Sequence, residues 1–265
     1  MTKVLQFTDT HLSRAGSFVS RKLNTRDCFI RLVQRVQEVA HQIEPVDAIV
    51  VTGDVSDDGS AESYVIFRSL AAVLDAPLFV IPGNHDRREA MRAAFGADGY
   101  LPPAGKLNWR GSAGDITLIG LDTLIEGEGG GELNDETFAF LQSALGDAGE
   151  APVLLALHHP PFRTGIQFMD RIGLKGSDQL AAVLTAHQGP LRVICGHIHC
   201  AMVAEVGGKT AMSGPSPASS FPMDLRDGAA AGFMTEPDGF MVHVWQDGFT
   251  STRIGIAGGD GPFPF

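Results

Sequence analysis

The sequence predicts an α/β fold arranged as a four-layer αββα sandwich, in which two mixed β-sheets are flanked by helices. Two observations predict it. Short β-branched apolar runs alternate with longer segments of helical apolar spacing, and the last quarter of the chain holds strand-like runs alone. The alternation favours parallel strands joined by right-handed crossovers, and strands without helices favour a second sheet. Because no linker-like change of composition interrupts the 265 residues, we expect a single domain over residues 1–265.

The first part of the chain has the pattern of a βαβαβ unit. Strands are predicted at residues 4–8, 48–52 and 78–81, where β-branched residues are frequent. A crossover helix is predicted at 25–42, because its apolar residues fall on one face and Asn24 or Thr25 can cap its start. Further helices are predicted at 61–74 and at about 88–95.

The alternation continues through the middle of the chain. Strands are predicted at 116–121, 153–157 and 193–195, and helices at 134–145 and from 177 to about 185, the latter capped by Ser177. Four strands follow at 202–206, 210–212, 240–245 and 251–256, and we expect them to form a second sheet packed on the first. The Gly-rich ending, residues 257–265, is expected to be a loosely ordered tail.

Three segments fit no regular element: residues 126–131, 160–175 and 213–232. Long irregular loops within a compact domain are usually functional or disordered. We therefore expect cap-like loops at these positions. The middle segment directly follows a pair of histidines, which makes it the best candidate for a loop that faces the substrate.

Composition excludes several classes of function. The net charge of −11 disfavours a long nucleic acid as partner, because nucleic-acid binders show a basic surface. No apolar stretch approaches the ~20 residues that cross a bilayer, so no membrane span is expected.

The start of the sequence lacks the pattern of a secretory signal, and three cysteines without a CxxC pair suit a reducing compartment, so we expect a cytoplasmic protein. Cys28 and Cys195 are expected to be buried thiols.

Five short polar clusters, each directly after an apolar run, carry most of the functional information. They contain Asp9 and His11; Asp54 and Asp57; Asn84, His85 and Asp86; His158 and His159; and His197 and His199. Because sites in α/β sheets form beyond the carboxyl ends of strands, we expect the five clusters to meet in one place. Six of the nine histidines fall in these clusters, whereas His41, His187 and His243 do not. This concentration predicts a two-metal site, against the alternative of ordinary turns and structural histidines.

Spacing within the clusters suggests how the side chains converge. Residues two apart in a strand share a face, so Asp9 and His11 can lean to the same side, and His197 and His199 can present both imidazoles on one face. The amide oxygen of Asn84 could bind a metal while the neighbouring His85 does acid–base work. Alternatively, residues 82–84 form only a tight turn.

At these residues the chain resembles the calcineurin-like metallophosphoesterases, whose motifs are DxH, GDxxD, GNH[DE], H and GHxH in that order. All five occur here, within about residues 3–215. The sequence His-His-Pro-Pro at 158–161 and the Met169-Asp170 pair look like the class III cyclic nucleotide phosphodiesterases and the related bacterial glycerophosphodiesterases. The resemblance implies the metallophosphoesterase fold and suggests a homo-oligomer built through the C-terminal strands and loops. An apolar patch, Phe221, Pro222, Met223, Leu225 and Phe233, could serve as a contact surface or could cover the site.

The resemblance also implies roles for individual residues. One metal ion would be held by Asp9, His11, Asp54 and His199, and the other by Asp54, Asn84, His158 and His197, so that Asp54 bridges the two. His85 would stabilise the transferring oxygens or protonate the departing alkoxide, and Asp57 would orient His85. His159 either faces the substrate from behind the ligands or packs below its strand. Asp86 is expected to be a structural acid, and Asp122 to have a scaffold or cap role.

The expected function follows from this site. Mixed N/O ligands without a thiolate suit Mn²⁺, Fe²⁺ or Zn²⁺. The resemblance implies a phosphodiesterase that hydrolyses small phosphodiesters, foremost 3′,5′-cyclic nucleotides such as cAMP, by in-line attack of a hydroxide shared by the metals. Alternatives on the same site are a glycerophosphodiesterase, a phosphomonoesterase and a 2′,3′-cyclic nucleotide hydrolase. A non-enzymatic metal scaffold is disfavoured, because every motif position holds a competent residue.

Overall fold

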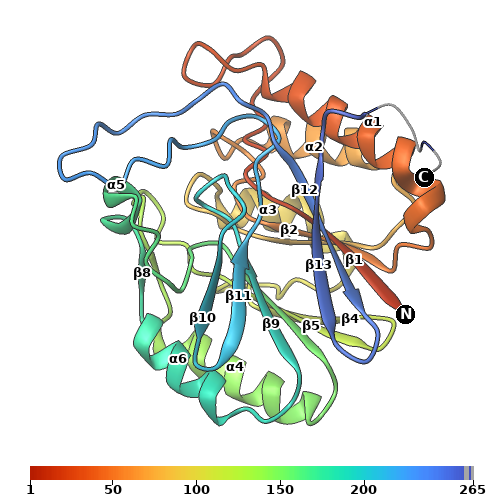
Figure 1. Cartoon of the computed structure of the whole chain (residues 1–265), viewed down its shortest axis with the longest axis vertical. Helices are drawn as coiled ribbons and strands as arrows, with labels where there is room; N and C mark the ends of the chain where they lie inside the picture. The colour runs from red at the N-terminus through yellow and green to blue at the C-terminus, as the bar shows by residue number, and fades with distance from the viewer. Residues whose placement is uncertain (260–262, 264–265) are drawn as a thin grey trace.

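Two β-sheets lie face to face in the computed structural model, which describes residues 1–259 and 263 (Figure 1). The first sheet has the order β13-β12-β1-β2-β3, with β1 at Thr2–Phe7, β2 at Ala48–Thr52, β3 at Leu78–Ile81, β12 at Gly239–Trp245 and β13 at Phe249–Gly255. The second has the order β10-β11-β9-β7-β5-β4, with β4 at Trp109–Ala113, β5 at Ile116–Leu121, β7 at Val153–Leu157, β9 at Leu191–Cys195, β10 at Val203–Val206 and β11 at Lys209–Ser213. Both sheets are mixed, because parallel strands at the centre are joined by antiparallel neighbours.

Helices cover the outer face of each sheet. The helices α1 (Thr25–Ile43), α2 (Ala61–Ala71) and α3 (Arg88–Phe95) pack on the first sheet, and α4 (Asp135–Ala148) and α6 (Ser177–Ala186) pack on the second. A third apolar cluster, which includes Val50, Trp109 and Ile194, fills the space between the sheets. The predicted αββα sandwich is therefore confirmed.

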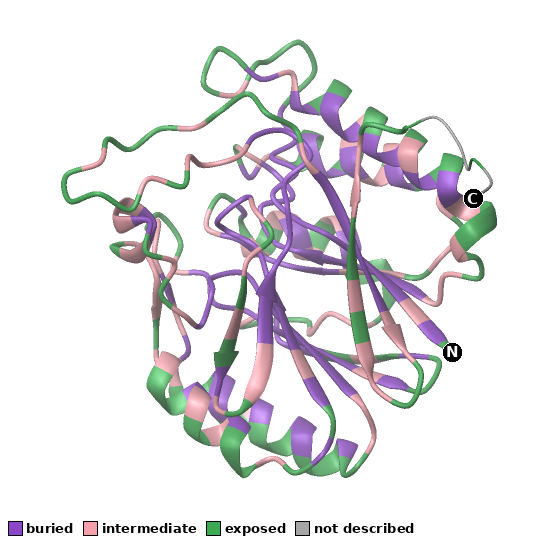
Figure 2. Cartoon of the chain, viewed as in Figure 1, coloured by how far each residue is buried: buried purple, intermediate pink, exposed green. Residues whose placement is uncertain are grey.

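Burial follows these layers (Figure 2). The central strands are buried along their whole length, whereas the helices are buried on one face only. Among the described residues, no helix combines the length and apolar character needed to cross a bilayer. In the segment between β11 and β12, residues 214–219 are buried, whereas residues 221–238 extend away from the body and are largely exposed. Cys28 and Cys195 are buried, as predicted.

The last strands do not form one sheet, which corrects the sequence prediction. Strands β10 and β11 extend the second sheet beside β9, but β12 returns to the first sheet and pairs antiparallel with β1. An alternating apolar pattern identifies a strand without identifying the edge on which it pairs. By covering β1, β12 and β13 keep the strand that leads to Asp9 and His11 away from the sheet edge.

Smaller elements also differ from the prediction. Helix α6 begins after Gly176, which has a left-handed backbone with φ 93°, and the hydroxyl of Ser177 donates to the Leu174 carbonyl instead of capping the helix. The segments at 126–131 and 160–175 are not wholly irregular. The short strands β6 (Gly131–Glu132) and β8 (Leu174–Lys175) pair with each other, and α5 spans Gln167–Asp170. Strand β4 and the 3₁₀ turn at Gly96–Asp98 were not predicted. Of the predicted tail, residues 260–262 and 264–265 lie outside the described residues.

Candidate metal centre

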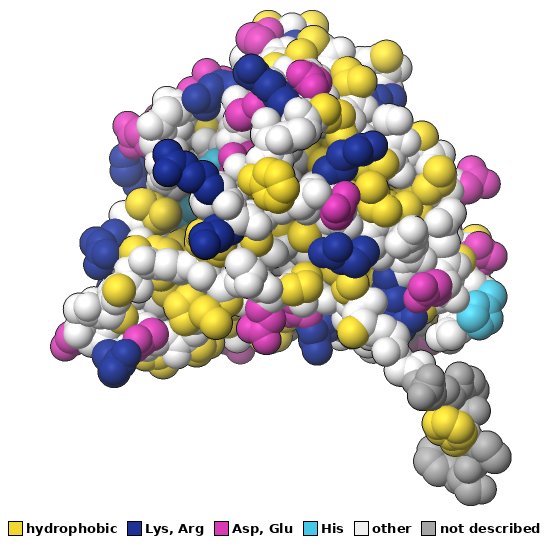
Figure 3. Space-filling view, turned by 90° about the horizontal axis from the view of Figure 1, so that it is seen from above, with side chains coloured by type: hydrophobic (Ala, Val, Ile, Leu, Met, Phe, Trp, Pro, Cys, Tyr) yellow, Lys and Arg dark blue, Asp and Glu magenta, His cyan; other side chains and the backbone are white. Residues whose placement is uncertain are grey.

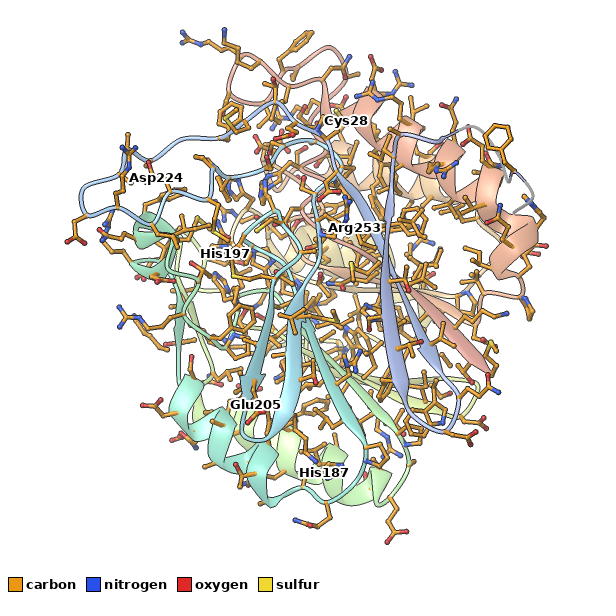
Figure 4. The ribbon with its side chains drawn as sticks, viewed as in Figure 1. Cys28, His187, His197, Glu205, Asp224 and Arg253 are labelled. Atoms are coloured by element: carbon orange, nitrogen blue, oxygen red, sulfur yellow. The ribbon has the colours of Figure 1, made fainter. Side chains whose placement is uncertain are left out.

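Loops after β1, β2, β3, β7 and β9 meet at the edge where the carboxyl ends of the two sheets come together. Main-chain hydrogen bonds join these loops directly. The N–H of Asp9 donates to the Gly53 carbonyl at 3.0 Å, and the N–H of Gly196 donates to the His158 carbonyl at 2.9 Å. The five clusters therefore lie in one place, as predicted, and both sheets contribute. Figure 4 labels His197 among the side chains that fill this region.

Left-handed backbone conformations turn the side chains inward. Asp9, His11, Asp54, His197 and His199 have φ values of 52°, 45°, 49°, 72° and 53°. Such conformations cost ~1–3 kcal/mol each for residues other than glycine and persist only where the surroundings impose them. All five residues lie beyond the strand ends, so strand alternation is not what aligns them. His197 and His199 do not share a face either, because each imidazole joins a different group of side chains.

The first group consists of Asp9, His11 and His199. Their nearest ligand atoms all lie within 4.8 Å of one another. The Nε2 atoms of His11 and His199 are 3.2 Å apart, and His199 Nε2 lies 3.5 Å from Asp9 Oδ1. His11 Nε2 also lies 3.5 Å from Asp54 Oδ2, which connects this group to the next.

The second group surrounds the side-chain oxygen of Asn84. Asn84 Oδ1 lies 3.1 Å from His158 Nε2 and 3.0 Å from His197 Nδ1. Asp54 Oδ2 is 3.4 Å from His158 Nε2, so the same carboxylate oxygen faces an imidazole of each group. The other oxygen of Asp54 accepts the N–H of His85 at 2.9 Å, which fixes the carboxylate.

The hydrogen bonds around these groups test whether a metal fits. The outward nitrogens of three imidazoles face acceptors: His158 Nδ1 donates to the Thr52 carbonyl at 2.8 Å, His197 Nε2 to the Ile172 carbonyl at 3.1 Å, and His11 Nδ1 to Asp57 Oδ1 at 3.1 Å. In the neutral form that binds a metal, each imidazole carries a single N–H on its outward nitrogen, so the inward nitrogen presents a lone pair. These lone pairs face carboxylate and amide oxygens, which are also acceptors. The donor set therefore fits divalent cations, with ring orientations fixed by the outer hydrogen bonds.

Burial and charge shift the pKa values in opposite directions. Burial opposes ionisation of Asp54, but the neighbouring charges of His158 and His11 dominate and hold the pKa of Asp54 well below its usual value. Burial would lower the pKa of His158, yet the carboxylate of Asp54 raises it to about 9. Burial lowers the pKa of both His197 and His199 well below the usual value, so these imidazoles are neutral at pH 7 and keep a lone pair. Positive charge is thus favoured beside Asp54, whereas the rings of His197 and His199 stay neutral.

Asp57 and His85 lie together at the rim. The carboxylate of Asp57 accepts from His11 Nδ1 at 3.1 Å and lies 3.5 Å from His85 Nδ1. The closer partner of His85 is the main-chain carbonyl of Asp57, which accepts from Nδ1 at 3.1 Å. Asp57 therefore orients two imidazoles, His11 through its carboxylate and His85 mainly through its backbone. His85 is 41% exposed at its side chain, which leaves its ring accessible.

His159 lies behind the site and away from the pocket. It is fully buried, its Nδ1 contacts the hydroxyl of Thr123 at 2.8 Å, and its Nε2 lies 3.1 Å from the Gly129 carbonyl. Its ring packs on that of His197, with centroids 4.5 Å apart. Both ring nitrogens of His159 thus contact protein atoms, and its ring packs against a neighbouring imidazole. Of the two roles expected for His159, the structure favours packing behind the site, because His159 does not line the cavity.

Asp86 and Asp122 are structural, as expected. Asp86 is fully buried and accepts hydrogen bonds from the N–H groups of Val55, Ser56 and Gly83 and from the hydroxyl of Tyr64. It thereby ties the loop after β2 to the loop after β3. Asp122 binds the guanidinium of Arg88 through both oxygens and lies outside the groups described above.

A cavity of about 220 Å³ opens beside the two groups. Its walls are formed by the motif residues His11, Asp54, Asp57, Asn84, His85, His197 and His199, and by Val19, Ser20, Leu23, Phe168, Met169, Ile172, Ala218, Ser219, Phe221 and Phe233. Histidines are visible at the floor of a hollow whose rim carries Lys and Arg side chains (Figure 3). The segments 160–175 and 213–232 thus reach the cavity. Segment 126–131 supplies none of the lining among the described residues.

Sequence reasoning missed the segment between β1 and α1, which contributes Val19, Ser20 and Leu23 to the cavity. Residues 13–24, directly after the first polar cluster, show neither the apolar spacing of a helix nor that of a strand. An irregular segment of this length within a compact domain could have identified the loop as a candidate for the site.

Comparison with known families agrees with this geometry. A family model described as calcineurin-like phosphoesterase matches residues 2–201. The chain belongs to the calcineurin-like phosphoesterase family. All five motifs named above lie within the matched range, so the resemblance on which the site was predicted is confirmed.

Two curated relatives of this calcineurin-like phosphoesterase carry different names. The probable glycerophosphodiester phosphodiesterase GpdQ of Arcobacter nitrofigilis is 31% identical over 265 residues, covering 99% of this chain and 96% of the relative. The 3′,5′-cyclic adenosine monophosphate phosphodiesterase CpdA of Pseudomonas aeruginosa is 34% identical over 219 residues, covering 82% of this chain and 77% of the relative. Among solved structures, a dimetal phosphatase from Danio rerio matches with a TM-score of 0.69 and 13% identity, covering 97% and 96% of the two chains, which shows the shared fold.

Proposed function

We propose that this calcineurin-like phosphoesterase is a two-metal phosphodiesterase that hydrolyses small phosphodiesters, with 3′,5′-cyclic nucleotides such as cAMP as preferred substrates. The observation that carries the proposal is the pair of groups described above, in which inward lone pairs of imidazole, carboxylate and amide donors face one another at 3.0–3.5 Å. Such a donor set is stable only around positive charge.

In the proposed site, Asp9, His11, Asp54 and His199 hold one ion, and Asp54, Asn84, His158 and His197 hold the other. The placement of Asp54 Oδ2 near His11 and His158 supports its role as the bridge. Mn²⁺, Fe²⁺ and Zn²⁺ all suit these ligands. When bound, two such ions supply charge neutralisation for the phosphate and lower the pKa of a water nucleophile.

The residues of the chain supply the remaining steps. His85 lines the cavity, and its Nδ1 is engaged by the Asp57 carbonyl, which leaves Nε2 to stabilise the phosphate oxygens or to give a proton to the leaving alkoxide. Asp57 keeps the rings of His11 and His85 in place. His159, behind His197, acts on the reaction only by holding the ligand imidazoles.

The cavity wall supports a cyclic nucleotide as substrate. Beside the proposed metal ligands, the wall contains apolar and aromatic side chains, among them Phe168 and Phe221 of the cap-like loops and Phe233, which directly follows the last of these loops. Phe221 lies against His199 with ring centroids 4.5 Å apart, so an aromatic face stands next to the proposed metal ligands. A flat base can pack on such a wall, whereas a glycerol group would leave it largely uncovered.

The alternative is a glycerophosphodiesterase, which the relative from Arcobacter nitrofigilis favours because it matches 99% of the chain. A phosphomonoesterase and a 2′,3′-cyclic nucleotide hydrolase would use the same residues. A metal scaffold without activity would leave His85 without a role.

The proposal extends to assembly and location. Met223 and Leu225 of segment 213–232 are 62% and 58% exposed, which supports a homo-oligomer formed through this loop. Light scattering of wild type and Met223→Ser would test it, with a lower mass expected for the variant.

The three cysteines are all free, which supports the cytoplasm as the location of the protein.

The deciding experiment compares kcat/KM for 3′,5′-cyclic AMP and glycerophosphoethanolamine, with manganese-loaded enzyme and a metal-free control. We expect manganese-dependent activity that is higher on cyclic AMP. A preference for the glycerol ester would establish the alternative, and failure on both substrates with metal bound would contradict the substrate class.

Asn84→Ala tests the metal site itself. We expect turnover to fall at least tenfold, because the second ion loses a ligand, while the circular dichroism spectrum stays unchanged. Unchanged activity with full metal content would remove Asn84 from the site.

A further inference from the structure

His197 depends on a different kind of support from His158, the other histidine proposed to hold the second ion. His158 is oriented by the carbonyl of Thr52, which is the last residue of a central strand. His197 is oriented by the carbonyl of Ile172, which belongs to the surface segment 160–175. The Nε2–H bond to Ile172 is what leaves the Nδ1 lone pair of His197 facing Asn84.

The position of Ile172 depends in turn on the fold of this segment. Its N–H donates to the Met169 carbonyl at 3.0 Å, so it continues directly from helix α5. On its other side, Gly173 accepts the N–H of Gly131 at 3.1 Å, next to the pairing of β8 with β6. Met169 packs with Ile198, the residue between the two histidines, in a small apolar cluster.

The carboxylate of Asp170, at the end of helix α5, binds the loop residues Thr164 and Gly165 that precede this helix. Its Oδ1 accepts from the N–H and the hydroxyl of Thr164, both at 2.8 Å, and its Oδ2 accepts from the N–H of Gly165 at 3.1 Å. No cationic partner contacts Asp170 in the described residues, so its carboxylate serves only to close this turn.

We infer that Asp170 is a positioning residue for the second metal ion, acting through the turn at 164–170, the Ile172 carbonyl and the ring of His197. The inference rests on the proposed two-metal function. It assigns to segment 160–175 a role beyond lining the cavity: the segment fixes the tautomer and rotation of a metal ligand. Among the described residues, no hydrogen bond ties a ligand of the first ion to this segment, since His11 is oriented by Asp57 and His199 contacts the hydroxyl of Ser219.

Asp170→Ala should therefore weaken one ion selectively. Groups that orient a ligand imidazole commonly change metal affinity ~10–100-fold when they are removed. We expect the Mn²⁺ dissociation constant of the second site, which contains His197, to rise at least tenfold, with that of the first site unchanged. Asp170→Asn keeps the acceptor for Thr164 and loses the one for Gly165, so its effect should be intermediate.

The experiment is titration calorimetry of the metal-free protein with Mn²⁺, with bound metal counted by elemental analysis. Asp227→Ala is the matched control, because Asp227 accepts a hydrogen bond from Gln167 on the outer side of the same helix without touching Thr164 or Ile172. This control should bind both ions as wild type does.

Three outcomes separate the possibilities. Selective loss of one ion in Asp170→Ala, with Asp227→Ala unchanged, supports the inference, and if the Ala variant does not fold, the same loss in Asp170→Asn supports it. Two ions bound with unchanged affinity in folded Asp170 variants overturns the inference while leaving the proposed function intact. Fewer than two ions on the wild-type protein overturns both.

Discussion

The Nε2 atoms of His11 and His199 lie 3.2 Å apart, although the other nitrogen of each ring already contacts a partner. His11 Nδ1 faces the carboxylate of Asp57, and His199 Nδ1 faces the hydroxyl of Ser219. Asp9 and Asp54 stand within 3.5 Å of these Nε2 atoms. Two imidazoles and two carboxylates this close together are stable when a cation lies among them.

Manganese should therefore stabilise the fold. A ligand at 100 times its dissociation constant adds about 2.7 kcal/mol to the free energy of unfolding, so Tm should be higher in MnCl₂ than in EDTA. Scanning fluorimetry measures this difference, and His199→Ala should lose most of it. His41→Ala, at an exposed histidine outside the site, should keep it. Identical Tm values for wild type in MnCl₂ and EDTA would contradict the metal site.

His85→Ala should affect substrates according to their leaving groups. A proton donor contributes ~10²–10⁴-fold, and mainly where the departing alkoxide is a strong base. We expect a loss of at least about 100-fold on alkyl phosphodiesters and a much smaller loss on bis(p-nitrophenyl) phosphate. Steady-state kcat/KM for the two esters gives the comparison. Equal losses would show that His85 does not protonate the leaving group.

Gly83→Ala should disable the site through Asp54. A Cβ at Gly83 would overlap the Oδ1 and the N–H of Asp54, so the carboxylate proposed to bridge the two ions must move. We expect at least a tenfold fall in turnover and weaker Mn²⁺ binding. Gly146→Ala is the control, since a Cβ there meets no atom within 4 Å and Ala stabilises a helix by ~0.5–1 kcal/mol. Normal activity of Gly83→Ala would contradict the bridging role of Asp54.

His243 should make the metal-free protein sensitive to acid. Burial lowers its pKa to about 3, and its ring bonds to Gln6 and Ser251. The unfolded chain binds a proton below its pKa of about 6.5 that the folded chain does not bind, so the free energy of unfolding falls as pH drops from about 6.5 towards 3. The slope from this group is at most about 1.4 kcal/mol per pH unit, and above pH 6.5 it contributes none.

Urea unfolding in EDTA at several pH values measures that slope. His243→Asn should show a shallower decline than wild type, whereas His41→Asn should match wild type. A slope unchanged by the His243 substitution would show that the buried ring does not control acid stability.

The ends of the strands were predictable because the signal is local. A β-branched run such as 48–52 stops directly before Gly53 and Asp54, so strand and cluster are read from neighbouring residues. The helix at Thr25–Ile43 was predictable for the same reason, since its apolar face is periodic. The prediction for Asp9 and His11 placed them correctly but for the wrong reason.

Their orientation was not predictable because it comes from left-handed backbone that distant partners impose, such as the Gly53 carbonyl that accepts from Asp9. The Ile172 carbonyl that orients His197 leaves no trace in the sequence either, because every residue has a carbonyl. Likewise, the return of β12 to β1 joins residues more than 230 positions apart, and no local pattern encodes that pairing.

The division of the site between two sheets has a consequence for synthesis. Asp9, Asp54 and Asn84 follow strands of the first sheet, while His158, His197 and His199 follow strands of the second. A nascent chain that has emerged only as far as α3 would carry three ligands of one proposed ion site, Asp9, His11 and Asp54, but only Asp54 and Asn84 of the other. Neither proposed ion site is complete until His197 and His199 have left the ribosome, so a product truncated before these residues would lack a ligand at both sites.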